Sequence, residues 1–325
     1  MRALICNEFA ALGDVQAGDL PVPEIGPDQV LIRVAAAGVN FYDTLIVQGK
    51  YQIKPPLPFS PGGESAGTVE TVGAGVTHVK PGDRVVAFSH YGAFAEFCSA
   101  PASQVFPLPD GVSFDIAAAS LVAYGTAWMA LYDRGRMQPG ETVLVLGAAG
   151  GVGLAAVQIA HRAGARVIAA ASSEDKLALC AAAGADFCVN YATDNLKDAF
   201  KSAVGPRGAD IVIDVVGNPY TEAALRATGW RGRVMIIGFA AGDIPRIPAN
   251  LVLLKGNEVS GVLWDGLLEK DPEMAREQVA DLMAAIADGS LAPRITARFP
   301  LEQGLDALNT LAERRVTGKV IVTPN

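Results

Sequence analysis

The stretch Glu141-Thr-Val-Leu-Val-Leu-Gly-Ala-Ala-Gly-Gly-Val-Gly153 decides the fold of this 325-residue chain. Its first half, 142–146, is an apolar run rich in β-branched residues, which predicts a buried strand. A cluster of glycines follows, and the apolar residues of 154–160 then recur at helical spacing. A strand, a glycine-rich turn and a helix in this order are typical of the phosphate-binding start of a dinucleotide fold. There the first N–H groups of the helix face an anion.

The glycines match the dinucleotide fingerprint in part. Gly150 and Gly153 take the last two positions of G-x-G-x-x-G, whereas Ala148 takes the first. Turns of this kind also occur without a ligand, so the motif alone leaves a purely structural interpretation open.

The middle of the chain alternates short apolar runs with helical patterns, which predicts a parallel, doubly wound sheet. The strands are expected at 142–146, 165–171, 187–190, 209–216, 232–238 and 258–264, and the helices at 117–132, 154–160, 173–183, 194–203 and 220–228.

The first 120 residues show no such alternation. Strands are expected at 29–35, 66–72 and 83–88, separated by many prolines and glycines, so a curled antiparallel sheet or partly open barrel is predicted. The end of the chain returns to this first domain, with helices at 273–286 and 304–312 and strands at 295–299 and 320–324. We therefore expect one domain from 1–122 with 266–325, and a dinucleotide-binding domain at 123–265.

Composition excludes several classes of protein. The formal charge of −8 argues against broad nucleic-acid binding, and no apolar run is long enough to span a membrane. The N-terminus lacks the apolar region of a signal peptide. The cysteines, Cys6, Cys98, Cys180 and Cys188, are scattered and are expected to be small buried apolar residues rather than disulfides or zinc ligands. A soluble cytoplasmic protein is predicted.

The end of the second strand of the dinucleotide domain distinguishes the two nicotinamide cofactors. NAD-binding folds usually place Asp or Glu there, and that carboxylate would repel a 2′-phosphate. This chain has Ser172 and Ser173 instead, and Lys176 can pair with the phosphate. Glu174 and Asp175 suit the first turn of a helix. The pattern predicts NADPH rather than NADH; simple N-capping by the serines is compatible with it.

Two polar stretches, Gly38-Val-Asn-Phe-Tyr-Asp43 and Pro61-Gly-Gly-Glu64, lie at strand ends in the first domain. Polar residues at strand ends can line a pocket. Asn40 and Asp43 are also good turn and N-cap residues, so turn chemistry alone is a second interpretation.

Together, these motifs and the segments Val79-Lys-Pro-Gly-Asp-Arg-Val85 and Arg314-Arg-Val-Thr-Gly-Lys319 make the whole chain resemble the medium-chain dehydrogenase/reductase superfamily. Within it, the chain is similar to the zinc-free quinone oxidoreductases. The resemblance implies a GroES-like, partly open β-barrel catalytic domain and a doubly wound Rossmann cofactor domain, an α/β fold class.

The resemblance also implies site residues. Asn40, Tyr42, Asp43 and Tyr51 are the candidate catalytic residues. NADPH is expected to contact Asn40, Thr126, Gly150, Gly151, Val152, Gly153, Ser172, Ser173, Lys176, Tyr191, Gly238, Phe239 and Arg314. Arg314 is preferred over Arg315 as the arginine that reaches an anionic cofactor group.

Zinc-dependent members of the superfamily carry a ligand Cys where this chain has Asn40 and a ligand His where it has Gly63. The resemblance therefore implies no metal, and His78, His90 and His161 are expected on the surface or in packing roles. Many quinone reductases of the family have Tyr where this chain has Leu45, so Tyr42 and Tyr51 are expected to supply the pocket hydroxyls.

The predicted activity is an NADPH-dependent, zinc-independent reduction of a quinone. Two alternatives stay open: reduction of the C=C bond of an enone or 2-alkenal, and NADPH binding without catalysis. The partners expected are a small electron acceptor and a second copy of the chain, joined through an edge strand at Val259–Trp264, with no nucleic acid and no membrane.

Overall fold

The computed structural model describes residues 1–324, and their contacts divide the chain into two compact units. The first unit comprises Met1–Val122 and the chain from Gly266 onward; the second is Ala123–Asp265. Each unit is described by itself. None of the described helices is both long and apolar enough to cross a membrane.

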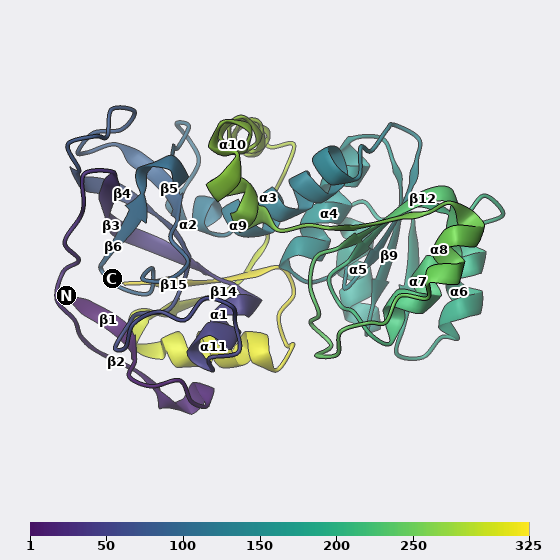
Figure 1. Ribbon diagram of the computed structural model, residues 1–325, viewed down its shortest axis with the longest axis horizontal. Coiled ribbons are helices and arrows are strands. Elements are labelled where there is room, and N and C mark those ends of the chain that lie inside the picture. Colours follow the sequence, from purple (N-terminus) through teal and green to yellow (C-terminus); the bar gives the residue numbers. More distant parts are fainter. Residues whose placement is uncertain (325) are drawn as a thin grey trace. The chain divides into compact units, whose positions relative to one another are not determined.

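The first unit is built on a seven-stranded sheet of order β14-β15-β3-β4-β5-β7, with β6 also paired to β3 (Figure 1). All its neighbouring strands run antiparallel except the parallel pair β14 and β15. This confirms that the sheet is mainly antiparallel, as predicted. Its strands are β3 (Gln29–Val39), β4 (Glu64–Val72), β5 (Arg84–Phe88), β6 (Phe97–Pro101), β7 (Val105–Pro107), β14 (Ile295–Pro300) and β15 (Lys319–Thr323).

Several smaller elements complete the first unit. The antiparallel pair β1 and β2 was not predicted. An apolar cluster around Leu4, Phe94 and Leu308 forms much of the core. The remaining elements are β1 (Arg2–Cys6), β2 (Val15–Asp19), α1 (Phe41–Val47), α2 (Phe114–Ala118), α9 (Trp264–Lys270), α10 (Pro272–Ala287), α11 (Gly304–Ala312) and the short 3-10 turns at 12–14, 102–104 and 301–303.

The second unit holds a six-stranded, entirely parallel sheet of order β10-β9-β8-β11-β12-β13. In chain order this is 3-2-1-4-5-6, the strand order of dinucleotide-binding folds, so the predicted doubly wound sheet is confirmed. Its strands are β8 (Thr142–Leu146), β9 (Arg166–Ala171), β10 (Phe187–Asn190), β11 (Ala209–Asp214), β12 (Thr228–Ile236) and β13 (Glu258–Gly261).

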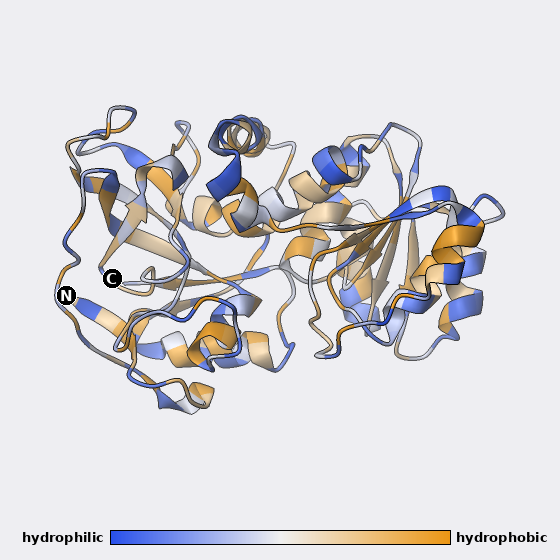
Figure 2. Cartoon of the chain, in the orientation of Figure 1, coloured by the Kyte–Doolittle hydropathy of each residue, from blue (hydrophilic) through white to orange (hydrophobic). Residues whose placement is uncertain are grey.

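Helices flank this sheet, and Figure 2 shows apolar strands with polar residues on the helices. All five residues of β8 are buried, as expected for a central parallel strand. The helices are α3 (Leu121–Trp128), a π-helical segment at 129–134, α4 (Gly151–Arg162), α5 (Glu174–Ala182), α6 (Leu196–Val204), α7 (Tyr220–Ala227) and α8 (Ala249–Lys255).

Several expectations were wrong in detail. The strand predicted at 232–238 runs from Thr228 to Ile236. The single helix predicted at 117–132 is broken near Ser120, whose hydroxyl donates to the Ala117 carbonyl at 2.9 Å. The strand predicted at 258–264 ends at Gly261, because Trp264 begins α9 and is buried against Gly125. Of the cysteines, Cys188 is exposed rather than buried.

Candidate functional site

A buried polar cluster lies in the first unit where β3 ends and β4 begins. It consists of Asn40, Asp43, Glu64 and Lys319, none of them more than 8 % exposed. The Lys319 ammonium donates to Glu64 Oε2 at 2.8 Å and to Asn40 Oδ1 at 2.6 Å. The Asn40 amide nitrogen donates to the same Glu64 oxygen at 2.8 Å. The second Glu64 oxygen accepts the backbone N–H of Val122 at 2.9 Å, so both carboxylate oxygens are satisfied.

Gly38 makes room for this cluster. It lies opposite Glu64 in the pairing of β3 with β4. A Cβ atom at Gly38 would overlap both the Glu64 carboxylate and the Ala118 carbonyl oxygen. The absence of a side chain at position 38 therefore lets the carboxylate turn inward toward Asn40.

Asp43 lies in the first turn of α1, fully buried. Its Oδ2 accepts the backbone N–H of Asn40, the N-cap residue of the helix, at 2.7 Å. The turn chemistry expected from the sequence is thus present. Burial raises the pKa of Asp43 to about 8, although the Asn40 N–H and the Lys319 charge act in the opposite direction. A protonated Asp43 balances the cluster, because Lys319 then faces only one carboxylate charge.

Tyr42 and Tyr51 form an aromatic wall beside this cluster. Their ring centroids are 5.5 Å apart, and Tyr42 also meets Phe88 edge-on at 6.4 Å. The Tyr42 hydroxyl fills the space next to Gly63, where a Cβ atom would overlap it. The structure thus brings the predicted residues Asn40, Tyr42 and Asp43 together on α1 and its N-terminus, and Tyr51 packs against Tyr42.

In the second unit, the turn between β8 and α4 has the geometry expected for an anion site. Gly147 adopts a left-handed backbone with φ of +67°, so the tight turn falls one residue before Ala148. A Cβ atom at Gly153 would overlap the Gly147 carbonyl oxygen, which explains the last glycine. The N-cap residue Gly150 offers no side chain to the first N–H groups of α4, those of Gly151, Val152 and Gly153.

The end of β9 gathers the residues predicted to recognise a 2′-phosphate. Lys176 Nζ lies 3.2 Å from Ser172 Oγ. Tyr191 lies beside them, because its backbone N–H donates to the Ala171 carbonyl at 3.0 Å. Ser173 occupies the N-cap position of α5, but its side chain makes no capping hydrogen bond. The N-capping expected of Ser173 is therefore not present.

The loops after β11 and β12 lie at the same edge of the sheet. Buried Asp214 shapes the first loop by accepting the N–H groups of Val216 and Gly217, each at 2.9 Å, and the Thr221 hydroxyl at 2.6 Å. Phe239 follows β12, and a Cβ atom at Gly217 would touch it at 3.2 Å. The predicted residues Gly238 and Phe239 therefore border the loop that Asp214 holds.

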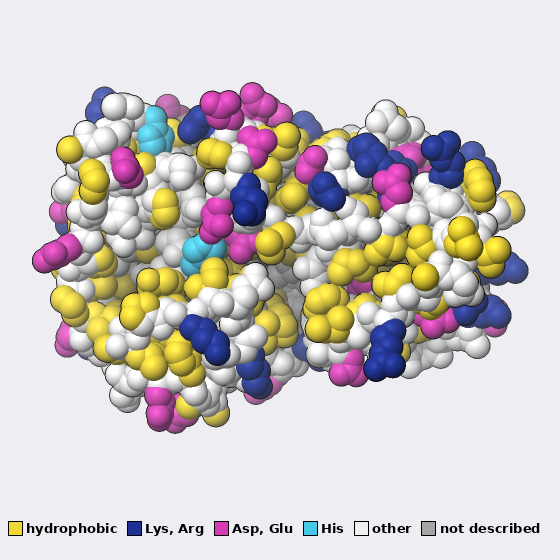
Figure 3. All heavy atoms as spheres, in the orientation of Figure 1, with side chains coloured by type: hydrophobic (Ala, Val, Ile, Leu, Met, Phe, Trp, Pro, Cys, Tyr) yellow, Lys and Arg dark blue, Asp and Glu magenta, His cyan; other side chains and the backbone are white. Residues whose placement is uncertain are grey.

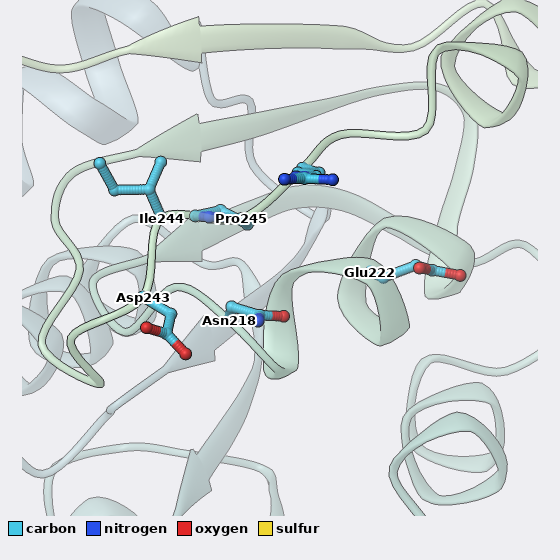
Figure 4. Close-up of a pocket in the computed structure, with 6 residues that line it drawn as sticks. Asn218, Glu222, Asp243, Ile244 and Pro245 are labelled. Atoms are coloured by element: carbon cyan, nitrogen blue, oxygen red, sulfur yellow. The ribbon is translucent and has the colours of Figure 1, made fainter.

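A pocket of about 400 Å³ opens at these loops (Figure 4). Figure 4 shows the side chains of Asn218 and Asp243 on one side of it, with Glu222 further along α7. The pocket is lined by Asn218, Glu222, Asp243, Ile244, Pro245 and Arg246, and none of the residues predicted from the sequence is among them.

Two predicted cofactor residues lie outside these groups. Thr126 is buried in α3. Arg314 is exposed in the turn before β15, with a left-handed φ of +57°, and belongs to the first unit. Their contact with the nucleotide stays a prediction.

Sequence reasoning missed Glu64 and Lys319 as site residues. Both stood inside quoted motifs, but nothing local shows that they pair across 255 positions of the chain. One sequence feature could have identified Lys319: it stands directly before the apolar run Val320-Ile-Val322. A charged side chain rarely begins a buried strand without a partner.

Two families match the chain. Residues 26–110 match the alcohol dehydrogenase GroES-like domain, and residues 151–285 match the family described as zinc-binding dehydrogenase. The first match lies within the antiparallel unit, and the second covers most of the parallel-sheet unit and continues to residue 285.

Individual relatives cover nearly the whole chain. Quinone oxidoreductase-like protein 2 of Rattus norvegicus is 40 % identical over 99 % of this chain and 92 % of its own length. The human synaptic vesicle membrane protein VAT-1 homolog is 34 % identical over all of this chain and 86 % of its own.

Solved structures agree with these relatives. A mycobacterial protein complexed with NADPH has a TM-score of 0.93 at 34 % identity, and the Escherichia coli quinone oxidoreductase complexed with NADPH has 0.93 at 29 %. Both comparisons cover 100 % of each chain. The chain belongs to the medium-chain dehydrogenase/reductase superfamily of oxidoreductases, in the group of the quinone oxidoreductase-like proteins.

Proposed function

We propose that this protein is an NADPH-dependent reductase that transfers a hydride to a quinone without zinc. The observation that carries the proposal is the pairing of a glycine turn, with its uncapped helix N-terminus, and a serine–lysine pair at the end of the neighbouring strand. The NADPH complexes of similar structures support the same cofactor.

The residues of the second unit fit this cofactor. Gly150, Gly151, Val152 and Gly153 would hold the pyrophosphate through backbone N–H groups. Ser172 and Lys176 would meet the 2′-phosphate, where no carboxylate occupies the strand end, and Ser173 and Tyr191 would flank it. Thr126, Gly238, Phe239 and Arg314 complete the proposed set. When bound, NADPH supplies the hydride, and the protein orients it and excludes water.

The residues of the first unit do not fit a catalytic zinc, although one matching family is described as zinc-binding. Zinc sites need several converging Cys, His or carboxylate ligands. Asn40 faces Lys319 and Glu64, and the Tyr42 hydroxyl fills the space beside Gly63 that a larger side chain would need. Within residues 1–324, no group of three potential ligands converges.

Without a metal, the negative charge that develops on the acceptor oxygen must be met by weaker donors. Asn40, Tyr42 and Tyr51 are the proposed donors, and the buried carboxyl of Asp43 holds the N-terminus of α1 that carries the first two. An acceptor whose reduced form spreads its charge over a conjugated system suits such a site. A quinone meets this condition better than a simple ketone.

We also infer a homodimer that forms through the free edge of the parallel sheet. The edge strand β13 exposes Val259, and α8 exposes Leu253 and Leu254 at 80 % and 70 %. Figure 3 shows apolar side chains gathered over the region of α8. Contiguous apolar surface next to an unpaired strand edge favours association with a second copy. A cytoplasmic location stays a prediction.

The test is an acceptor panel with the chelator-treated protein. NADPH oxidation should be fastest with 1,4-naphthoquinone, slower with a 2-alkenal and undetectable with a simple ketone. Turnover of simple ketones but not of quinones or alkenals would refute the assignment. NADPH binding without turnover of any acceptor would favour the non-catalytic alternative.

A further inference from the structure

The amide of Asn40 can adopt only one of its two orientations. Its Oδ1 faces the Lys319 ammonium at 2.6 Å, and its Nδ2 faces the Glu64 carboxylate at 2.8 Å. A flipped amide would set an NH₂ group against an ammonium and a carbonyl oxygen against a carboxylate, and neither pair can form a hydrogen bond. The Lys319–Glu64 ion pair therefore fixes the orientation of the amide, with Oδ1 toward Lys319 and Nδ2 toward Glu64.

Stability alone does not account for this ion pair. Lys319 and Glu64 side chains are 4 % and 0 % exposed, so both charges have lost their hydration. Buried ion pairs commonly contribute no more stability than apolar residues of similar volume. The pair ties the start of β15 to the start of β4. Both of its residues bond to Asn40, which is a candidate catalytic residue.

The fixed orientation leaves one donor of Asn40 weakly used. One Nδ2 hydrogen is held by Glu64, whereas the other meets only the Gly38 carbonyl, at 3.4 Å. A contact of that length is at the limit of a hydrogen bond, so this hydrogen can turn to a better acceptor. We expect this hydrogen to be donated to an oxygen of the electron acceptor or to the carboxamide oxygen of the cofactor.

We propose that Lys319 is a positioning residue of the site: together with Glu64 it orients the Asn40 amide so that one N–H donor remains available to a ligand. This inference rests on the proposed function. Lys319 itself touches neither substrate nor cofactor.

The kinetic test compares three variants with the wild-type protein, using NADPH and 1,4-naphthoquinone. Lys319→Met leaves the charge of Glu64 without its counter-ion. The Asn40 amide is then no longer held in one orientation, and this misorientation is expected to lower kcat by up to about 10²-fold. Glu64→Gln/Lys319→Met restores neutrality, and should regain the thermal midpoint while kcat stays low. Lys50→Met, at an exposed lysine of the same unit, is the matched control and should leave kcat unchanged. Joint recovery of thermal midpoint and kcat in the double variant would overturn the proposal.

A second measurement does not depend on turnover or on whether the Lys319 variants fold. In wild-type protein labelled with ¹⁵N-asparagine, the Nδ2 signal is identified by its loss in Asn40→Ser. Rotation about an amide C–N bond is slow, so the two Nδ2 hydrogens give separate signals in any case. In a fixed amide, the hydrogen held by Glu64 should exchange with water more slowly than the other hydrogen. Equally rapid exchange of both hydrogens would overturn the orienting role. Inactivity of the wild type with every acceptor would instead refute the proposed function, and the spectrum would still decide the orientation.

Discussion

Gly63→Ala tests the geometry of the aromatic wall beside the polar cluster. The new methyl group would lie closer than 3.0 Å to the Tyr42 hydroxyl and 3.0 Å from the His90 carbonyl oxygen. Tyr42 cannot swing away freely, because its ring packs on Tyr51 and Phe88. Overpacking of an interior costs about 1–3 kcal/mol. Replacing glycine by alanine also lowers the entropy of the unfolded chain, which returns about 0.4–1 kcal/mol.

The expected net result is a loss of roughly 1–2 kcal/mol in the free energy of unfolding. Denaturant titration followed by circular dichroism measures it. Gly13→Ala is the matched control, since a Cβ atom at Gly13 meets nothing within 4 Å, and it should not destabilise. Tyr42→Phe removes the oxygen that is overlapped, so Gly63→Ala/Tyr42→Phe should recover part of the loss relative to Tyr42→Phe alone. Equal stability of Gly63→Ala and Gly13→Ala would refute this packing.

Three further predictions follow from the contacts of other residues. Lys176→Ala should weaken NADPH binding by about tenfold to a hundredfold, the effect of a lost hydrogen bond to a charged group, and leave NADH nearly unchanged; equal losses in calorimetry would contradict phosphate recognition there. Because the pKa of Asp43 is raised to about 8, its contribution to the free energy of unfolding is complete below about pH 4. As the pH rises to 8, that contribution is lost by about 1 kcal/mol per pH unit. Asp43→Asn should flatten that slope in denaturant titrations, and an unchanged slope would show that Asp43 is ionised in the folded protein. Leu253→Asp should convert a dimer to a monomer in light scattering, whereas a monomeric wild type would remove the proposed interface.

The parallel sheet could be predicted from the sequence because its central strands are buried on both faces. A strand such as β8 must then be a continuous apolar run, and the turn after it must contain glycine where the helix packs against the strand. The bounds of β8, β9 and β10 were predicted to within a residue, whereas those of β11, β12 and β13 were not. The residue with a left-handed backbone is Gly147, one residue before the first position of the fingerprint, and only the backbone geometry shows this.

Helix boundaries and short elements were harder to predict. The break near Ser120 depends on a side-chain hydrogen bond to the backbone, which competes with the helix in a way that apolar periodicity does not reveal. Trp264 looked like the end of an apolar strand, but its indole packs against Gly125, and the chain turns into α9 to allow this. The helix α8 was missed because Leu251 and Val252 pack against the core while Leu253 and Leu254 are exposed, which does not give the usual apolar stripe.

The candidate site was predictable only where its residues are close in the sequence. Asn40, Tyr42 and Asp43 belong to one turn, so their proximity follows from α1 alone. Glu64 and Lys319 reach Asn40 across 24 and 279 positions, and such pairs are set by the tertiary fold. The resemblance to a family pointed to Asn40, but the cluster that holds it required the structure.

Calorimetric titration of NADPH into chelator-treated protein tests the central claim most directly. The glycine turn, Ser172 and Lys176 predict a measurable heat at one site per chain, with clearly weaker binding of NADH. Chelation should not change the result, because the proposed binding site uses no metal. An absence of heat with NADPH, or equal affinity for the two nucleotides, would contradict the account.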